Sequence, residues 1–267
     1  MGVKLVALDI DGTIIPPAAY GHDLLPSKRI QHAVQSLTAS GVAVVLASGR
    51  MFPGTRRIAQ SLDLPGPVIC QQGCSVHLLD GTMTHEFPIE RTTALDIISY
   101  ARQIERAYEW FNPLRYIASA SSEATEQYGA VSDITPEYRP DPENSGIEPT
   151  GVGIISDVAQ APLIHRELVQ RHGEAVHVLD FPTVTVAVAA NANKGHALSL
   201  ICADLGIERH ETIAVGDSVN DASMLTWAGR GYAMSHSDRY ALDAADEVLG
   251  QSEDEELAEL LERLARR

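Results

Sequence analysis

The sequence predicts an α/β protein built on a doubly wound, parallel, Rossmann-like sheet, with an α+β domain inserted into it. Three observations lead to this prediction. The first 80 residues alternate short apolar runs with amphipathic segments, as the strand–helix units of a parallel sheet do. The alternation stops near residue 80. It resumes after residue 190 with an amphipathic segment and another apolar run, so the intervening segment interrupts one sheet.

The amino-terminal part is expected to contain three strands and two helices. The strands are expected at residues 5–8, 42–47 and 68–70, and the helices at 28–40 and around 57–62. A polar loop leads from the first strand to Ser27, which favours the N-cap of the first helix. Ile30, Val34 and Leu37 form a single apolar stripe on that helix. The run at 42–47 is apolar throughout, which is typical of a strand covered on both faces.

The segment between about residues 80 and 190 does not continue this alternation. Its expected elements are helices near 92–106 and 161–171 and short strands at 116–118 and 152–155. Residues 135–150 are rich in Pro, Glu, Asp and Gly, which indicates a loop. We expect the chain to enter this domain near 82–86 and to leave it near 187–191. The prediction is therefore a core of residues 1–84 and 189–267 with an inserted domain of residues 85–188.

The carboxy-terminal part returns to the first pattern. Helices are expected at residues 194–205, 222–228 and 254–267, and strands at 212–215, 231–233 and 247–249. The last helix starts with acidic residues and ends with Arg263, Arg266 and Arg267, in agreement with the helix dipole.

Composition restricts the function. The chain of 267 residues carries a formal net charge of -16, and 45% of its residues are hydrophobic. Such an acidic chain has no electrostatic attraction for nucleic acid or for an anionic membrane, so neither is expected as a partner. No apolar run is long enough to span a bilayer, and we expect a cytoplasmic protein. Three cysteines without the spacing of a disulfide framework agree with a reducing compartment.

The first strand ends in the group Asp9-Ile10-Asp11-Gly12-Thr13. If the strand period of two continues through Ile10, Asp9 and Asp11 leave the same side of the backbone. Two carboxylates in one small space require a cation, a shared proton or water, which indicates a metal or acid–base site. Gly12 lets the chain turn and leaves Thr13 and backbone N–H groups free to face an anion. A solvated Asp-Gly turn is the simpler alternative.

Further polar residues follow other strands at the same predicted edge of the sheet. They are Ser48 and Arg50 after the second strand, Lys194 at the start of a helix, and Asp217, Ser218, Asn220 and Asp221 after the strand at 212–215. Ligands of open parallel sheets bind beyond the carboxyl ends of the strands. Hard oxygen ligands of this kind favour Mg²⁺, which takes one or two carboxylates and keeps water and phosphate oxygens as its other ligands.

Each of these residues also has a structural alternative. Ser48 could begin the next helix, and Lys194 could be a solvated lysine at a helix start. Arg50 could form a structural ion pair. Asn220 or Asp221 could cap the helix that follows. Their coincidence at one edge of one sheet favours a functional site.

Together these residues resemble the four motifs of the haloacid dehalogenase superfamily of phosphatases. The motifs are Asp9-Ile10-Asp11-Gly12-Thr13, Ser48, Lys194 and Gly216-Asp217-Ser218-Val219-Asn220-Asp221. The long insert resembles the C2-type cap of the Cof-like (type IIB) branch, which includes sugar-phosphate phosphatases. The chain departs from many relatives at Gln71-Gln72-Gly73, where they have Asn-Gly. It also lacks the small hydroxyl residue that often precedes the lysine.

The resemblance implies a Mg²⁺-dependent phosphatase that acts on a small phosphorylated metabolite, such as a sugar phosphate, through an aspartyl-phosphate. Asp9 would be the nucleophile and Asp11 the general acid and base. The implied metal ligands are Asp9, Asp11 through its backbone carbonyl, and Asp217. Ser48 and Lys194 would act in catalysis by holding the phosphoryl oxygens. Further substrate contacts would come from Gly12, Gly49, Arg50 and Asn220. Asp221 would support these residues without touching the substrate.

Two other functions remain open. One is a phosphomutase or phosphotransferase on the same fold, in which the phosphoryl group passes to a sugar instead of water. The other is a non-catalytic module in which the aspartate is phosphorylated without turnover, although the presence of Asp11 and Lys194 argues against it. Substrate choice is expected to come from the cap and its closure over the core, and no oligomeric state is predicted.

Overall fold

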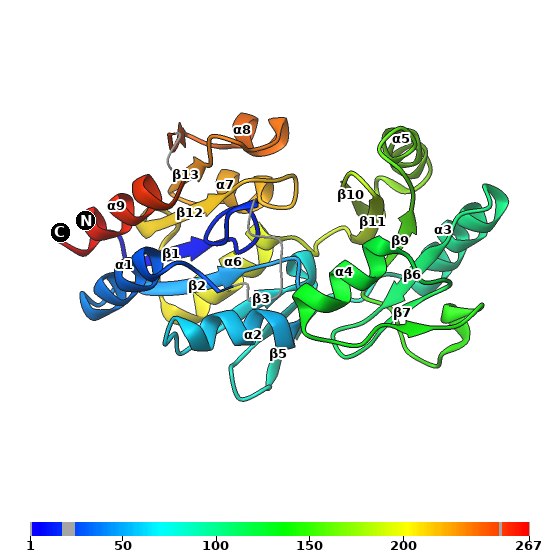
Figure 1. Ribbon diagram of the computed structural model, residues 1–267, viewed down its shortest axis with the longest axis horizontal. Helices are drawn as coiled ribbons and strands as arrows, with labels where there is room; N and C mark the ends of the chain where they lie inside the picture. Colours follow the sequence, from blue (N-terminus) through cyan, green and yellow to red (C-terminus); the bar gives the residue numbers. More distant parts are fainter. Residues whose placement is uncertain (1, 18–24, 251–252, 267) are drawn as a thin grey trace.

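The computed structural model describes residues 2–17, 25–250 and 253–266 and has two lobes, each built on its own sheet (Figure 1). Both ends of the described chain lie at the outer end of the first lobe. Residues 18–24 of the expected polar loop and the expected last helical residue, Arg267, lie outside the described residues. Within the described ranges, none of the helices combines the length and apolar character needed to cross a bilayer.

The first lobe, the core, contains a sheet with the strand order β14-β13-β12-β1-β2-β3-β4-β5. Its strands are β1 (Leu5–Leu8), β2 (Ala43–Ala47), β3 (Val68–Cys70), β4 (Ser75–His77), β5 (Met83–Glu86), β12 (Thr212–Gly216), β13 (Arg230–Ala233) and β14 (Glu247–Val248). All pairings are parallel except those of β4 and β5, which form an antiparallel edge that the sequence analysis did not anticipate. Leu8 on β1 pairs with Leu46 and Val215, so the central strands end together.

Helices cover both faces of the core sheet. On one face lie α1 (Lys28–Ala39), α2 (Phe52–Ser61) and α9 (Glu253–Ala265), and on the other α6 (Lys194–Leu205), α7 (Ala222–Trp227) and α8 (Arg239–Ala244). Val6 and Leu8 pack with the first group and Leu5 and Ala7 with the second, so β1 is buried on both sides. This is the doubly wound α/β arrangement that the sequence predicts. The helix α2 begins five residues before the predicted segment at 57–62, and α8 was not predicted.

The second lobe, the cap, contains a sheet with the order β10-β11-β9-β6-β7-β8. Its strands are β6 (Tyr108–Phe111), β7 (Tyr116–Ala118), β8 (Glu137–Tyr138), β9 (Gly151–Ile155), β10 (Val176–Asp180) and β11 (Val184–Ala189). All neighbours are antiparallel except β7 and β8. The expected loop at 135–150 is therefore not free of structure, because it holds β8 and a 3₁₀ turn at Pro142–Asn144.

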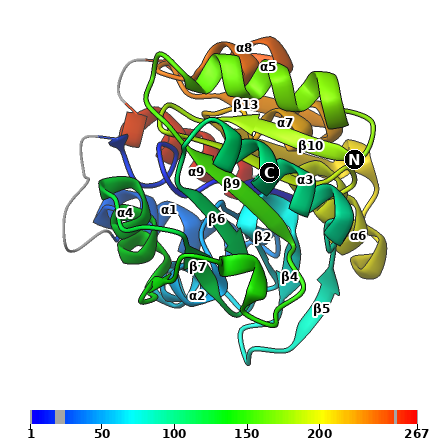
Figure 2. The same cartoon turned by 90° about the vertical axis from the view of Figure 1, so that its right-hand side faces the viewer.

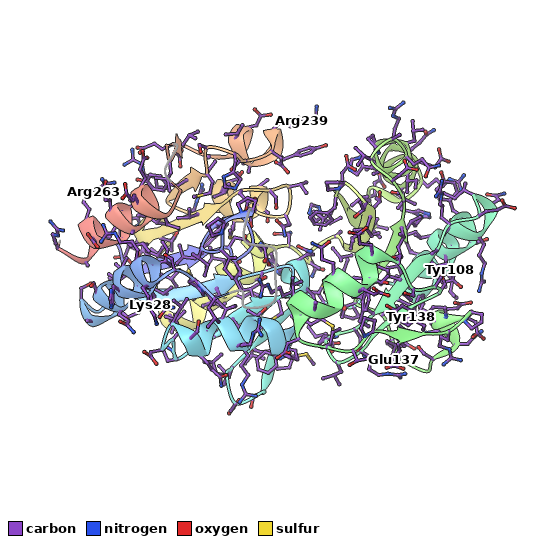
Figure 3. The ribbon with its side chains drawn as sticks, in the orientation of Figure 1. Lys28, Tyr108, Glu137, Tyr138, Arg239 and Arg263 are labelled. Carbon is purple, nitrogen blue, oxygen red and sulfur yellow. The ribbon has the colours of Figure 1, made fainter. Side chains whose placement is uncertain are left out.

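The cap has different coverings on its two faces. Helices α3 (Arg91–Gln103) and α5 (Ala161–His172) lie on the face away from the core, where Trp110 is fully buried (Figure 2). Helix α4 (Glu123–Ser132), which the sequence analysis did not predict, lies beside the core (Figure 1). Figure 3 shows the labelled Tyr108, Glu137 and Tyr138 in this lobe, and Lys28, Arg239 and Arg263 in the core.

The chain enters the cap after β5 and returns to the core after β11. Strand β5 ends at Glu86, two residues beyond the predicted division at 84, and β11 ends at Ala189. Hydrogen bonds between described residues join the lobes. Tyr128 donates to the carbonyl of Gly49 (3.2 Å), the Met51 N–H donates to Ser132 Oγ (3.1 Å), Gln71 Nε2 donates to the carbonyl of Asn112 (2.9 Å), and Cys74 Sγ donates to the carbonyl of Thr150 (3.7 Å). These bonds hold the inner face of the cap sheet over the carboxyl edge of the core sheet.

Candidate active site

The loop after β1 positions the first carboxylates. Strand β1 ends at Leu8, so the strand period does not extend through Ile10 as the sequence analysis supposed. Asp9 still donates its N–H to the carbonyl of Val215 (3.0 Å), which keeps it beside β12. The chain then makes a tight turn in which Gly12 donates to the carbonyl of Ile15 (2.8 Å). Gly12 has a φ of +93°, as its expected role in a turn requires.

Lys194 lies between two carboxylates. It is the first residue of α6, whose N-cap Asn193 accepts the N–H of His196. Lys194 Nζ is 2.6 Å from Asp9 Oδ1 and 2.6 Å from Asp221 Oδ1, and the lysine is fully buried. Burial alone lowers the pKa of Lys194, but the two carboxylates outweigh this and hold its pKa above the ordinary value. The alternative of a solvated lysine at a helix start is therefore excluded, and Lys194 is a charged group inside the site.

Asp221 accepts hydrogen bonds from Lys194 and from the backbone of its own loop. Its Oδ2 accepts the backbone N–H groups of Asp217 (2.9 Å) and Ser218 (3.0 Å). Although Asp221 occupies the N-cap position of α7, its side chain makes no capping hydrogen bond there. A Cβ on Gly216 would lie 2.5 Å from the Asp221 side chain, so this glycine gives the carboxylate its place. Asp221 thus fixes the loop that carries Asp217.

Asp217 completes a group of three carboxylates. Oxygen atoms of Asp9, Asp217 and Asp221 lie within 4.8 Å of one another. Thr13 Oγ1 donates to Asp217 Oδ1 (3.1 Å), and a Cβ on Gly12 would lie only 2.2 Å from Asp217 Oδ2. Burial, with neighbouring carboxylates, raises the pKa of Asp9 to about 7 and that of Asp217 to about 9. Three carboxylates facing one ammonium leave excess negative charge, and these residues therefore fit a divalent cation.

Asp11 is held apart from this group by Arg50. Arg50 Nε and Nη2 donate to Asp11 Oδ2 and Oδ1 at 2.7 and 2.5 Å. The guanidinium is buried, and Nη1 has no partner in the part of the chain that the structure describes. Ser48 Oγ accepts the N–H of Arg50 (3.1 Å) and so shapes the turn after β2, and the N-cap of α2 is Met51, not Ser48. Asp9 and Asp11 line the same cavity but have different partners.

Gln71–Gly73, where the sequence departs from many relatives, forms a tight turn after β3. Gln71 and Gln72 have φ values of +49° and +65°, and Gly73 lies so close to α6 that a Cβ there would be 2.3 Å from the Asn193 carbonyl carbon. Asn220 Nδ2 donates to Gln72 Oε1, and Ser218 Oγ donates to Asn220 Oδ1 (2.7 Å). Gln72 therefore joins the turn after β3 to the Asp217 loop.

A cavity of about 360 Å³ lies between these loops and the cap. The predicted site residues that line it are Asp9, Asp11, Gly49, Arg50, Asp217 and Asn220. Gly12, Ser48, Lys194 and Asp221 are not part of its lining, since they support the lining residues from behind. The cap contributes residues that the sequence analysis did not single out, among them Glu109, Phe111, Tyr128 and Phe181. A glutamate between aromatic residues, Tyr108-Glu109-Trp110-Phe111, was the one signal available for Glu109.

Residues 6–261 match the family model described as haloacid dehalogenase-like hydrolase. The chain belongs to this family. It is a Cof-like phosphatase of the haloacid dehalogenase superfamily, as the resemblance of its motifs implied.

Similar proteins extend over nearly the whole chain. The phosphatase YwpJ of Bacillus subtilis is 24% identical over 98% of this chain and 100% of its own length. The 5-amino-6-(5-phospho-D-ribitylamino)uracil phosphatase YitU, also of Bacillus subtilis, is 24% identical over 96% of each chain. The crystal structure of a haloacid dehalogenase-like hydrolase from Bacteroides thetaiotaomicron has a TM-score of 0.82 at 23% identity, covering 98% of this chain and 99% of that one. The present chain therefore has the same fold as the Bacteroides thetaiotaomicron protein, including the cap.

Proposed function

We propose that this phosphatase hydrolyses a small phosphorylated metabolite with the help of Mg²⁺, through an aspartyl-phosphate formed on Asp9. The observation that carries the proposal is the buried Asp9 carboxylate at the cavity wall, held by Lys194 at 2.6 Å and grouped with Asp217 and Asp221. The core, residues 1–84 and 189–267, would carry the chemistry, and the cap, residues 85–188, would cover it. The named substrate of the relative YitU, a small phosphate monoester, supports the substrate class.

Asp9, Asp217 and the backbone carbonyl of Asp11 would hold the cation. The excess of carboxylates over cationic groups around Asp9 supports this assignment. When bound, Mg²⁺ would neutralise charge between the nucleophile and the phosphate and act as a Lewis acid.

In the first half-reaction, Asp9 would attack phosphorus. Lys194 holds Asp9 Oδ1, and no hydrogen bond within the described chain reaches Oδ2, which is therefore suited to the attack. The new bond joins Oδ2 to phosphorus while the ester P–O bond breaks, and the leaving oxygen takes the proton of the Asp11 carboxyl group. For this transfer the Asp11 carboxyl must give up one of its two bonds to Arg50.

In the second half-reaction, water would attack the phosphorus of the aspartyl-phosphate. Asp11, now a carboxylate, takes the proton of the water, and the break of the P–O bond to Asp9 restores the free carboxylate and releases phosphate.

Arg50 would hold phosphoryl oxygens at the cavity wall, with the N–H of Gly49 as a further donor. Arg50 lines the cavity and its Nη1 has no partner within the described chain, which supports its part in this. Lys194 and Ser48 lie behind that wall and would act by positioning Asp9 and Arg50. The Gly12 N–H, expected to face an anion, is instead donated to the Ile15 carbonyl. Asn220 would add an amide at the same wall.

Substitution of the nucleophile tests the proposal. We expect Asp9→Asn to lower kcat for p-nitrophenyl phosphate by at least about 10³-fold, since the amide is not a nucleophile. Acid-quenched wild-type enzyme should yield a phosphorylated peptide containing Asp9, measured by mass spectrometry. Asp243→Asn, on the exposed surface of α8, is the matched control and should keep full activity. An Asp9→Asn protein with the wild-type rate would refute the nucleophile assignment.

A further inference from the structure

Glu109 is a buried carboxylate on the cap wall of the cavity. It lies in the centre of β6, where the alternation of the strand turns Tyr108 and Trp110 toward the outer helices and Glu109 and Phe111 toward the core. The side chain is about 5% exposed and lines the same cavity as Asp9. It is thus the one acidic cap residue among the described residues of that lining.

Only half of this carboxylate has a partner. The Tyr116 hydroxyl donates to Glu109 Oε1 at 2.5 Å, whereas no donor of the described chain reaches Oε2. Oε2 lies over Gly153 of the neighbouring strand, because a Cβ there would be 2.4 Å away. Burial accordingly raises the pKa of Glu109 to about 7. Oε2 is not among the sealed, unsatisfied atoms of the described chain, so it is open to the cavity, where water or a ligand donor can supply the missing hydrogen bond.

A second buried glutamate of the cap shows which hydrogen-bond partners a structural carboxylate has in this domain. Glu143 is equally buried, but Arg102 Nη2 donates to one of its oxygens (2.5 Å) and the Tyr108 hydroxyl to the other (3.0 Å). Both of its oxygens are thus used, and Glu143 does not line the cavity. Glu109 has no cation of this kind within the described chain, so the structure leaves its charge for something that enters the cavity.

The surroundings of Glu109 are apolar. Phe111, Tyr128 and Phe181 present aromatic side chains to the cavity, and Val131, Val184 and Val186 add aliphatic ones. Such walls favour a flat, apolar body over a strongly hydrated one. Arg50 is the single cationic side chain among the described lining residues, and it belongs to the core wall and is paired with Asp11. A second anionic group on the leaving group would therefore meet a carboxylate and apolar walls without a counter-charge.

We propose that Glu109 selects the leaving group, and that the enzyme prefers phosphate monoesters whose leaving group has an apolar ring, carries an N–H donor and has no second anionic group. This inference rests on the proposed phosphatase chemistry at Asp9. The ring lies between Phe111, Tyr128 and Phe181, and the N–H donates to Glu109 Oε2. Glu109 is a residue of substrate recognition and takes no part in the proton transfers at phosphorus.

Three matched esters test the inference. Benzyl phosphate has the ring alone, 4-(aminomethyl)benzyl phosphate adds an N–H donor, and 4-carboxybenzyl phosphate adds a second anion at the same position. We expect kcat/KM of the wild-type enzyme to be highest for the aminomethyl ester and lowest for the carboxy ester. The ratio of kcat/KM for the aminomethyl ester to kcat/KM for the carboxy ester should be on the order of 10- to 100-fold, because a hydrogen bond to a charged group is involved.

Glu109→Gln is the decisive variant. Its amide can still accept the Tyr116 hydroxyl bond, but it then turns an NH₂ donor toward the cavity in place of the Oε2 acceptor. The aminomethyl-to-carboxy ratio of kcat/KM should fall by about 10- to 100-fold, to about unity or below. Glu143→Gln, which also removes a buried, tyrosine-bonded carboxylate of the cap, should leave this ratio unchanged.

Gly153→Ala tests the role of Glu109 in a second way, without altering a polar side chain. Its Cβ would displace Glu109 Oε2, so the ratio should fall several-fold here too. An unchanged ratio in active, folded Glu109→Gln or Gly153→Ala protein would overturn the inference while the phosphatase chemistry stood. Wild-type enzyme that released no phosphate from any of the esters or from p-nitrophenyl phosphate would overturn the proposed function and this inference with it.

Discussion

The core wall and the cap wall of the cavity both contain buried carboxylates, but only those of the core wall are bonded to cationic side chains of the described chain. On the core wall, Asp9 is bonded to Lys194, and Asp11 is bonded to Arg50. On the cap wall, Glu109 has one neutral hydroxyl as its partner within the described chain. On the core side, internal cations therefore balance part of the charge and the excess fits a divalent cation, whereas on the cap side no cation of the described chain is bonded to Glu109 and its charge is left for the ligand to balance. This difference suits a core that performs one reaction and a cap that selects what reacts.

Removal of the core's counter-charge should have the largest effect on stability. Lys194→Met keeps the length of the side chain but leaves Asp9 and Asp221 buried without their ammonium. We expect a loss of about 3 to 5 kcal/mol in the free energy of unfolding, measured by urea denaturation, because breaking a buried pair leaves uncompensated charge. Phosphatase activity should be lost as well.

Two further variants identify the cause of that loss. Lys28→Met removes an exposed lysine of α1 and should change stability by less than about 0.5 kcal/mol. Adding Asp221→Asn to Lys194→Met removes one of the two buried, unpaired charges of the broken network and should recover part of the stability without restoring activity. A double variant no more stable than Lys194→Met would mean that packing, not charge, is what the lysine supplies.

The same contrast explains what the sequence could predict. The core residues of the site follow strands that are apolar throughout, and the carboxyl ends of parallel strands meet at one edge. Spacing alone therefore brought Asp9, Arg50, Asp217 and Asn220 together in the prediction, and they line one cavity in the structure. The antiparallel strand β5 was missed because Met83–Glu86 is mostly exposed at a sheet edge and has neither an apolar run nor an alternating pattern.

The cap residues of the site could not be found in this way. Helix α4 has no apolar stripe, since it buries Thr125, Gly129 and Ser132 and packs beside α2 through small groups. Periodicity consequently does not reveal it, although it brings Tyr128 to the cavity. Glu109 depends on Gly153 of a strand that is distant in sequence, and only the pairing of β6 with β9 brings the two together.

The unbalanced charge of the cap should be visible in the pH dependence of stability. The pKa of Glu109 is raised from 4.5 to about 7 by burial. Between these values the unfolded chain has released this proton and the folded protein still holds it, so the free energy of unfolding falls as pH rises from about 4.5 to 7. Above pH 7 the full cost, about 3 kcal/mol, is present. Glu109→Gln removes it.

Urea denaturation at intervals from pH 4 to pH 8 measures this effect. Relative to wild type, Glu109→Gln should gain about 3 kcal/mol of stability between the two ends of the range. Glu148→Gln changes an exposed carboxylate of the cap and should run parallel to wild type. Parallel curves for wild type and Glu109→Gln would show that something in the protein already balances the charge of Glu109.

The smallest expected effect concerns the hydrogen bond that joins the two walls. Tyr128→Phe removes the bond to the Gly49 carbonyl and keeps the ring contact with Tyr116, whose centroid is 4.7 Å away. The loss should be about 1 kcal/mol in the free energy of unfolding. Because this bond bridges the lobes, the amides of the two connecting segments, residues 87–90 and 190–193, should exchange hydrogen faster in the native state.

Tyr138→Phe provides the matched comparison for that last effect. Its hydroxyl bonds Thr125 Oγ1 at 3.1 Å within the cap, so a similar loss of stability is expected with no change of exchange in the connecting segments. The pair of variants thus separates the strength of a hydrogen bond from its position between lobes. Equal exchange in the two variants would mean that the bonds from Met51 and Gln71 suffice to hold the cap, and that Tyr128 serves the cavity through its ring alone.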